Sequence, residues 1–288
     1  MRKIQRTLMA VASQASMAAL FAGAVPSLVC AQVAASSDWK TSGQASFVSD
    51  YVFRGVSQTW GKPAAQVSVT ADHASGAYAS FFASNVAPQF VPNANLETDW
   101  SLGYKTKMSG LDLDVGGIFI YYPGGNFKNT FNGSTLNPSN PQTLELYVSA
   151  AASGASLRFG YIPGRFFGWN ENNSGVGNFN ANEPTAGLKT DSSSGAWALD
   201  ASYTLAVTEG WSLQFAVGHQ EVPKSVETSW SYGRLALNGD LGNSWSMNVA
   251  ASATTQPKSF KNFPSLTGNG QEYSPAKSKL ILTLAKAF

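Results

Sequence analysis

The sequence predicts an all-β protein: a closed antiparallel transmembrane β-barrel of about 12 strands, with short periplasmic turns and long extracellular loops. Charged residues make up only 12% of the chain, about half of the share that is usual for a soluble domain. Apolar and polar residues alternate over about twelve segments, each near the ~9–11 residues that a tilted membrane strand needs. Short and long connections alternate between these segments, as they do in outer-membrane barrels.

The first 31 residues have the pattern of a secretory signal peptide. A basic start is followed by an apolar stretch from Leu8 to Val25, and a small-residue cleavage site ends at Ala31. A lipoprotein acylated on Cys30 is the disfavoured alternative, because Ser27 stands where a leucine is expected. We therefore expect a cleaved leader at 1–31 and one barrel domain at 32–288.

The charge of the mature chain excludes one class of partner. Cleavage after Ala31 removes three of the 19 basic residues and leaves 16 against 17 acidic ones. A chain with no basic surplus is not expected to bind nucleic acid. The only cysteine, Cys30, leaves with the leader, so the strands rather than disulfides must stabilise the fold.

The strands are predicted from period-two alternation, which is clearest at 96–106. There Trp100, Leu102 and Tyr104 share one face, while Asp99 and Lys105 share the other. The remaining predicted strands are Gly43–Phe53, Gln66–Asp72, Tyr78–Val86, Leu111–Tyr122, Leu144–Ala150, Leu157–Tyr161, Trp197–Leu205, Trp211–Val217, Trp230–Asn238, Trp245–Ala253 and Leu280–Phe288.

The connections sort into two classes, and the short ones suggest the strand register. Short turns are expected at His73–Gly76, Lys107–Gly110, Ala152–Ala155, Val207–Gly210 and Gly239–Ser244. Centring two of these turns places Lys105 opposite Asp112 and Val148 opposite Phe159. Long loops are expected at Gly55–Pro63, Ala87–Asn95, Pro123–Gln142, Pro163–Gly195, Glu221–Ser229 and Thr254–Lys279.

The two faces of the strands indicate a membrane. One face carries Leu, Val, Phe, Tyr and Trp, whereas the other carries small and polar residues that could not fill a soluble core. We expect the apolar face to contact lipid, with Trp197, Trp211, Trp230 and Trp245 in interfacial girdles. For Trp230 this requires a bulge near Tyr232. The terminal Phe288, in phase with Leu284, is the expected assembly signal.

A run of short motifs resembles a known family. Residues 49–59 read SDYVFRGVSQT, and PAAQ, SGAY and SNV follow at 63–66, 75–78 and 84–86. This run resembles the TorF family of bacterial outer-membrane porins. One departure is that Ser80–Ala83 lacks the Gly and Trp expected before SNV. The resemblance implies a transmembrane barrel with pore activity, and it implies no particular substrate.

Strand phase places a set of charged residues in the lumen as candidates for lining and selectivity. They are Asp50, Arg54, Glu97, Asp99, Lys105, Asp112, Asp114, Glu145, Arg158, Asp200 and Arg234. Opposed charges across a constriction create a transverse field that filters solutes. The alternative is that these are ion pairs within the wall, such as Lys105 with Asp112, which fill a narrow lumen. The sequence leaves both open.

The motif Arg54, Gly55, Ser57, Gln58 and Thr59 lies where the first strand enters its outer loop. Arg54 can fold inward to bind a carboxylate or phosphate of a solute, or the motif can tie the loop to the wall. The second interpretation is favoured.

The function predicted from the sequence is passive diffusion of small hydrophilic solutes through a narrow polar lumen. A non-conducting barrel with binding or adhesive loops is the alternative, followed by a lipid-modifying enzyme. An enzyme is not expected, because His73 lies in a turn and His219 has only Ser202 and Ser212 nearby. We expect no cofactor and no metal. The expected location is the outer membrane of a Gram-negative bacterium, and the expected partners are its lipid and lipopolysaccharide, the barrel-assembly machinery and small polar solutes.

Overall fold

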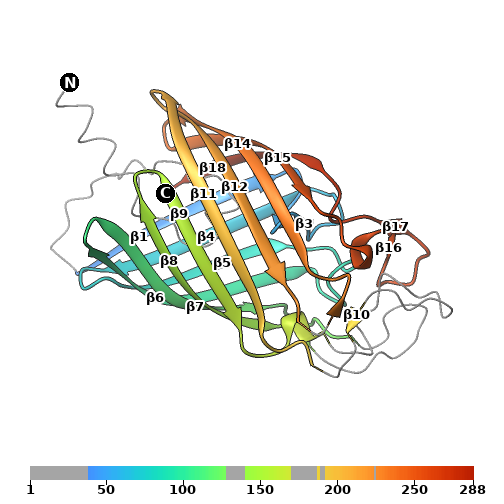
Figure 1. The fold of residues 1–288 in the computed structure, drawn as a ribbon. Helices are drawn as coiled ribbons and strands as arrows, with labels where there is room; N and C mark the ends of the chain where they lie inside the picture. The colour runs from blue at the N-terminus through green and yellow to red at the C-terminus, as the bar shows by residue number, and fades with distance from the viewer. Residues whose placement is uncertain (1–37, 128–139, 170–186, 189–191, 224) are drawn as a thin grey trace.

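The structure is a computed structural model, and it describes residues 38–127, 140–169, 187–188, 192–223 and 225–288. The predicted leader, 1–31, lies outside the described residues. Within them the chain folds into one closed barrel of strands that lean steeply against the barrel axis (Figure 1).

Twelve strands form the barrel wall, and each predicted strand corresponds to one of them. They are β1 (Trp39–Val48), β4 (Ala64–His73), β5 (Ala77–Asn85), β6 (Leu96–Met108), β7 (Leu111–Tyr121), β8 (Thr143–Ala152), β9 (Ala155–Ile162), β11 (Ala196–Thr208), β12 (Trp211–Glu221), β14 (Trp230–Gly242), β15 (Trp245–Thr254) and β18 (Lys279–Ala287). Neighbouring strands are antiparallel throughout, and β1 closes the barrel on β18. The predicted fold class is confirmed.

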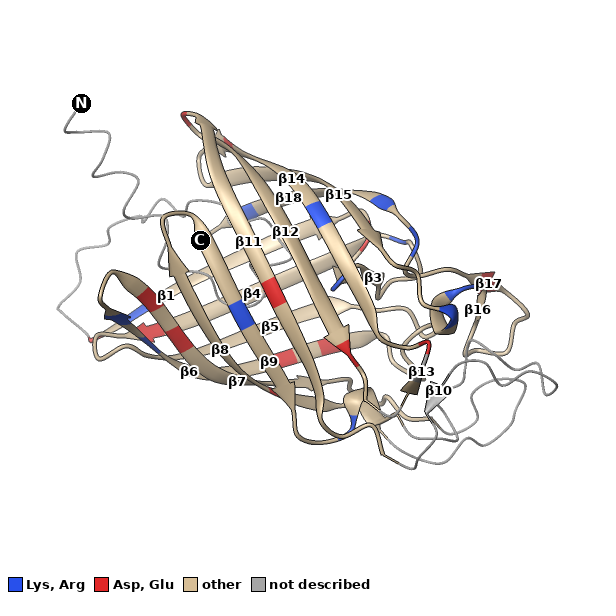
Figure 2. Ribbon diagram, viewed as in Figure 1, with Lys and Arg blue, Asp and Glu red and all other residues tan. Residues whose placement is uncertain are grey.

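The outer surface of the barrel is apolar along its whole length. Leu102 is 71% exposed, Val217 63% and Leu280 77%, and the strand residues between such positions point inward. Few charged residues interrupt the wall (Figure 2). A belt of exposed large apolar side chains is stable against lipid and unstable against water, so the barrel spans a membrane. No helix in the described ranges is long and apolar enough to cross one.

The connections divide between two ends, here called the turn end and the loop end. At the turn end, Ser109 and Gly110 both have positive φ, 50° and 82°, and Ser153 and Gly154 repeat this arrangement. Such two-residue turns match the twist of the strands they join. The C-terminus lies at this end (Figure 1), where the Phe288 N–H donates to Gly43 O over 2.9 Å.

The register confirms one predicted pairing and corrects another. Val148 lies opposite Phe159, as predicted. Lys105 lies opposite Asp114 rather than Asp112, and Lys107 lies opposite Asp112. The reason is that the turn consists of Ser109 and Gly110, so its centre lies one residue later than that of the predicted turn at 107–110, which moves each partner by two positions. The faces are unchanged, because side chains alternate with a period of two.

The prediction for Trp230 was wrong. Trp230 is 3% exposed and faces inward, and β12 pairs with β14 in continuous register from Gln220–Trp230 onward. The irregularity lies instead between Asp240 and Gly242. Trp230 is therefore not part of the aromatic girdle at the loop end. Trp245, at the turn end, remains 42% exposed.

The first strand also ends earlier than predicted. Barrel pairing of β1 stops at Val48, and the chain then turns inward through β2 (Val52–Phe53) and β3 (Val56–Ser57), which form a small hairpin. Apolar and polar residues keep alternating through this hairpin, and for this reason the sequence predicts a wall strand up to Phe53. Two further small pairs lie in the loops, β10 (Gly187–Leu188) with β13 (Ser225–Val226) and β16 (Phe263–Pro264) with β17 (Glu272–Tyr273).

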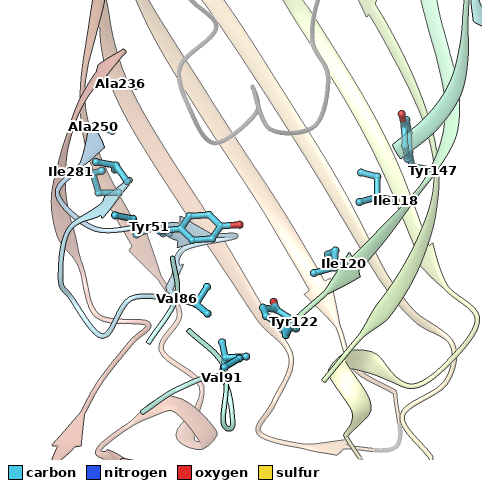
Figure 3. Packing of buried hydrophobic residues seen from close by; sticks show 14 residues of the cluster. Tyr51, Val86, Val91, Ile118, Ile120, Tyr122, Tyr147, Ala236, Ala250 and Ile281 are labelled. Atoms are coloured by element: carbon cyan, nitrogen blue, oxygen red, sulfur yellow. The ribbon is translucent and has the colours of Figure 1, made fainter. Parts of the chain in front are cut away.

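Buried apolar residues lie inside the barrel rather than between sheets. Tyr51, Val86, Val91 and Tyr122 approach one another where the first two loops fold toward the lumen, and Ile281 lies on the wall behind Tyr51 (Figure 3). A second cluster, around Trp230 and Phe260, lies among the loops. Buried apolar side chains therefore gather toward the loop end, whereas the Lys105–Asp72 and Lys107–Asp112 ion pairs lie toward the turn end.

Candidate functional site: an inserted hairpin in the lumen

The hairpin β2–β3 projects Arg54 from its tip. Arg54 and Gly55 occupy the two turn positions with φ values of 46° and 81°. This turn prefers residues such as Asn-Gly, because a non-glycine side chain is strained at positive φ. An arginine is therefore costly at the first position, and contacts of its side chain must offset the strain.

Arg54 contacts three strands of the opposite wall. Its guanidinium donates to both carboxylate oxygens of Glu145 on β8, over 2.8 and 2.9 Å. It also donates to Gln220 Oε1 on β12 over 2.8 Å and reaches Asp200 Oδ2 on β11 at 3.5 Å. A two-pronged arginine–carboxylate pair has a fixed geometry. Arg54 is 1% exposed, so the hairpin is held across the lumen.

The wall residues around this pair form one network. Arg158 on β9 donates to Glu145 Oε1 over 3.0 Å and stacks on the Tyr147 ring at 3.6 Å. Glu145 thus receives two guanidinium groups. Burial lowers the pKa of Arg54, but Glu145 and Asp200 outweigh this effect and raise that pKa above its usual value. Gly160 leaves the space for Glu145, because a Cβ there would lie 2.4 Å from Oε1.

The base of the hairpin is fastened to the wall that it leaves. Asp50 accepts hydrogen bonds from Ser57 Oγ over 2.5 Å and from Thr59 Oγ1 over 2.9 Å, and Lys279 Nζ lies 3.7 Å away. Burial raises the pKa of Asp50, while Lys279 and the two hydroxyls pull it back. Tyr51 donates a short hydrogen bond to Glu97.

The other loop-one residues serve the hairpin as well. Gly55 lies against β14 and β15, since a Cβ there would be 2.5 Å from Thr254 Cγ2. Gln58 donates to Val56 O over 3.0 Å. The motif is therefore placed as a loop tied to the wall.

A cavity of about 1130 Å³, partly open to solvent, lies beside the hairpin in the lumen. Asp50, Asp99, Asp200 and Arg234 line it together with serine and threonine side chains. Arg234 donates to Gln214 over 3.1 Å and to Asn248 over 2.7 Å. Both partners are neutral, so the charge of Arg234 acts on the cavity.

Three predicted candidates, Lys105, Asp112 and Asp114, lie away from the hairpin. Lys105 pairs with Asp72 at 3.0 Å rather than with Asp112, which pairs with Lys107 at 2.6 Å. Asp114 accepts a hydrogen bond from Tyr78 over 3.0 Å. These groups satisfy one another within the wall near the turn end.

Several residues of the network were not among the candidates. Gln220 and Lys279 lie just beyond the predicted strand ends, and extending the alternation by a few positions would have placed both inside. Asp72 was assigned to a strand but not to the lumen. Trp230, whose Nε1 donates to Arg54 O over 2.7 Å, carried no signal that could have identified it, because its contact depends on the inserted hairpin.

His219 has other partners than the serines named from the sequence. Ser231 Oγ lies 2.9 Å from Nδ1 and Glu221 Oε2 lies 3.1 Å from Nε2. The Ser231 N–H donates to Thr255 Oγ1 over 3.1 Å. A serine nucleophile commonly uses its own N–H in the oxyanion hole, and here that N–H is engaged.

Comparisons with solved structures return barrels with very low identity. The KdgM porin in complex with disordered oligogalacturonate is 8% identical, with 86% of this chain and 99% of that chain covered and a TM-score of 0.47. An outer membrane channel from Pseudomonas putida F1 is 12% identical, with 88% and 97% covered and a TM-score of 0.43. OprD of Pseudomonas aeruginosa is 11% identical, with 87% and 66% covered and a TM-score of 0.35.

Among curated proteins none matches the chain. A family model matches residues 32–288 and describes a bacterial protein of unknown function, Gcw_chp. This is a different name from the TorF family that the motifs resemble, so the TorF resemblance stays a prediction. The chain belongs to the Gcw_chp family of bacterial proteins.

Proposed function

We propose that this chain is an outer-membrane porin through which small hydrophilic solutes diffuse, with the hairpin β2–β3 as its constriction. The observation that supports this most is the combination of an apolar outer wall with a cavity lined by Asp99, Asp200 and Arg234. Buried charges are costly unless they are paired or solvated. A lumen that holds a partly unpaired set of charges is suited to passing polar solutes. The TorF resemblance supports the same function.

The location and partners follow from this proposal. An apolar belt of strands suits an outer membrane, with its lipid and lipopolysaccharide on the loop side and the barrel-assembly machinery acting on β18 and Phe288. Single cysteines at Ser153 and Glu209 should then react with an impermeant thiol reagent only after the outer membrane is opened. A cysteine at Gln271, in the last loop, should react on intact cells. The reverse pattern contradicts this orientation.

The inserted hairpin also favours a second candidate. Arg54 spans the lumen, and a barrel closed in this way would conduct nothing and would present its loops for binding or adhesion. Single-channel recording in planar bilayers separates the two, because the porin requires discrete conductance steps from the wild-type chain. Liposome swelling with graded sugars, amino acids and anions then gives the size and charge of the solutes. A wild type without conductance in both assays supports the scaffold.

A further inference from the structure

A second cavity, of about 730 Å³, lies at the loop end of the barrel. Five of the six long connections contribute to its lining, and Trp230 at the start of β14 completes it. That volume includes space that is open to solvent, so the pocket can be entered from outside. It is thus a pocket at the centre of the mouth rather than a groove on one surface. We call it the mouth pocket.

The lining of the mouth pocket is aromatic and uncharged. The rings come from different parts of the chain and pack at tilted or edge-on angles. The ring centroids of Phe90 and Phe263 lie 5.3 Å apart, and so do those of Trp230 and Phe260. None of the described residues that line it carries a charge. Tilted packing leaves ring faces and edges open to a further ring, and the absence of charge in this lining disfavours an ionic ligand.

One ring of the pocket is held under strain. Phe167 has φ 47° and ψ 38° within the short 3₁₀ turn η2 (Phe166–Gly168). A bulky residue rarely adopts this left-handed conformation, and such outliers concentrate at functional sites. The conformation places the Phe167 ring 6.2 Å from Phe53 and 6.4 Å from Tyr122, where it lines the pocket.

Phe53 connects the pocket to the lumen. It lines both the mouth pocket and the lumen cavity, and the guanidinium carbon of Arg54 lies 4.9 Å from its ring centroid. A ligand in the mouth pocket therefore rests on the same hairpin that spans the lumen. Gln58 also lines the pocket, and its Nε2 is already bound to Val56 O, which leaves its amide oxygen to accept one hydroxyl.

We propose that the mouth pocket binds an uncharged aromatic small molecule that carries one hydroxyl, and that this is the solute class captured before it enters the lumen. The proposal rests on the proposed porin function for the entry step alone, since binding in the pocket needs no conduction. Sugars are the alternative occupants of aromatic sites. They are disfavoured here because one amide oxygen cannot satisfy their many hydroxyls.

The probe that tests this is 4-nitrobenzyl alcohol, a neutral ring with one hydroxyl whose nitro group quenches tryptophan fluorescence. Trp169 and Trp230 line the pocket and report its arrival. The refolded full chain should show quenching that saturates, unlike the non-saturating quenching that probe dissolved in the micelle produces. The anion 4-nitrobenzoate should bind at least about tenfold more weakly, and glucose should not compete.

Two variants locate the binding. Phe90→Ala should weaken it about tenfold, and Phe167→Gly should do the same while relieving the backbone strain, so either one suffices if the other fails to fold. Phe215→Ala is the matched control, because Phe215 is 49% exposed on the lipid face, and it should bind as the wild type does. Heat-modifiable migration in gels confirms folding.

Four results overturn the proposal. Three of them are no saturable quenching by the wild type, equal loss in Phe215→Ala, and equal affinity for 4-nitrobenzoate. The fourth is competition by glucose, which would identify a sugar site. These outcomes are separate from those of the proposed function. Conductance without binding refutes the pocket alone, and binding without conductance refutes the porin alone.

Discussion

Arg54 and Glu145 form a two-pronged ion pair across the lumen, although 91 residues separate them in the chain. The two residues are each 1% exposed, and Arg54 sits at a strained turn position. The pair joins the first loop of the barrel to the wall on its far side. It makes the hairpin part of the structure of the lumen instead of a free loop.

Replacing Arg54 by Ala should open the lumen. The substitution removes the donors that hold the hairpin and leaves Glu145 paired with Arg158 alone, so we expect a loss of about 3–5 kcal/mol in stability. The single-channel conductance of the folded fraction should rise, because the hairpin no longer spans the lumen. Planar-bilayer recording and urea titration measure the two effects.

Two variants test the role of the pair itself. Arg54→Lys keeps the charge but loses the two-pronged geometry, so its conductance should lie between those of the wild type and Arg54→Ala. Once Arg54 is absent, adding Glu145→Ala should produce little further change, since the two residues act together. Fully additive effects would show that the pair does not hold the hairpin.

Alternation between apolar and polar residues made the barrel predictable. It placed all twelve strands and, apart from Trp230, their two faces, because lipid selects for apolar side chains at every second position. Register was less predictable, since Lys105 and Asp112 keep their faces whether the turn has two or four residues. Only the turn conformation at Ser109–Gly110 decides between the pairings.

The inserted hairpin could not be predicted, because residues 49–57 alternate as a wall strand does. Whether such a segment continues the barrel or folds inward depends on partners such as Glu145 and Gln220, which are distant in sequence. The mouth pocket was equally hidden. Its rings come from loops whose sequences share no period, and each one, taken alone, looks like a surface aromatic.

The two faces of β6 should respond differently to arginine. Leu102→Arg places a charge in lipid and should destabilise the barrel by about 2–4 kcal/mol if the position lies near the midplane. Ser101 lines the lumen cavity, so Ser101→Arg should leave the stability almost unchanged, because water solvates the new charge. Urea titration of both variants in vesicles compares them. A similar cost at the two positions would contradict the assignment of lipid and lumen faces.

Deleting Phe288 should reduce assembly. Phe288 exchanges backbone hydrogen bonds with Gly43, and its ring covers that glycine, where a Cβ would lie 2.3 Å from the ring. Loss of the residue removes the last hydrogen-bonded residue pair of the seam, by which we mean the contact between β1 and β18 that closes the barrel. The heat-modifiable fraction in gels should fall, and Gly43→Leu should lower it for the same reason. Gly233→Leu is the control, because the nearest heavy atom to a Cβ there is 3.9 Å away. An unchanged yield for the deletion and for Gly43→Leu would refute this role of the seam.

Ser231 should not act as a nucleophile. His219 contacts Ser231 and Glu221 contacts His219, as in a catalytic set. The Ser231 N–H, however, already donates to Thr255 and is not available to a developing oxyanion. Detergent-activated lipase assays should give background rates for the wild type. Ser231→Ala should not change them. Turnover that Ser231→Ala abolishes would establish a lipid hydrolase instead.

Arg234 should set part of the ion selectivity. Its side chain donates to Gln214 and Asn248, both neutral, while it lines the cavity, so Arg234→Gln removes a positive charge from the lumen. Reversal potentials across a salt gradient should shift toward cations. High salt should weaken the shift, because lumen charges that face water are screened over about 8–10 Å at physiological ionic strength. Lys107→Gln is the matched control, since Lys107 pairs with Asp112 at the turn end and its side chain is 71% exposed. A shift of equal size in that control, or none in Arg234→Gln at intact conductance, would mean that Arg234 only supports the wall.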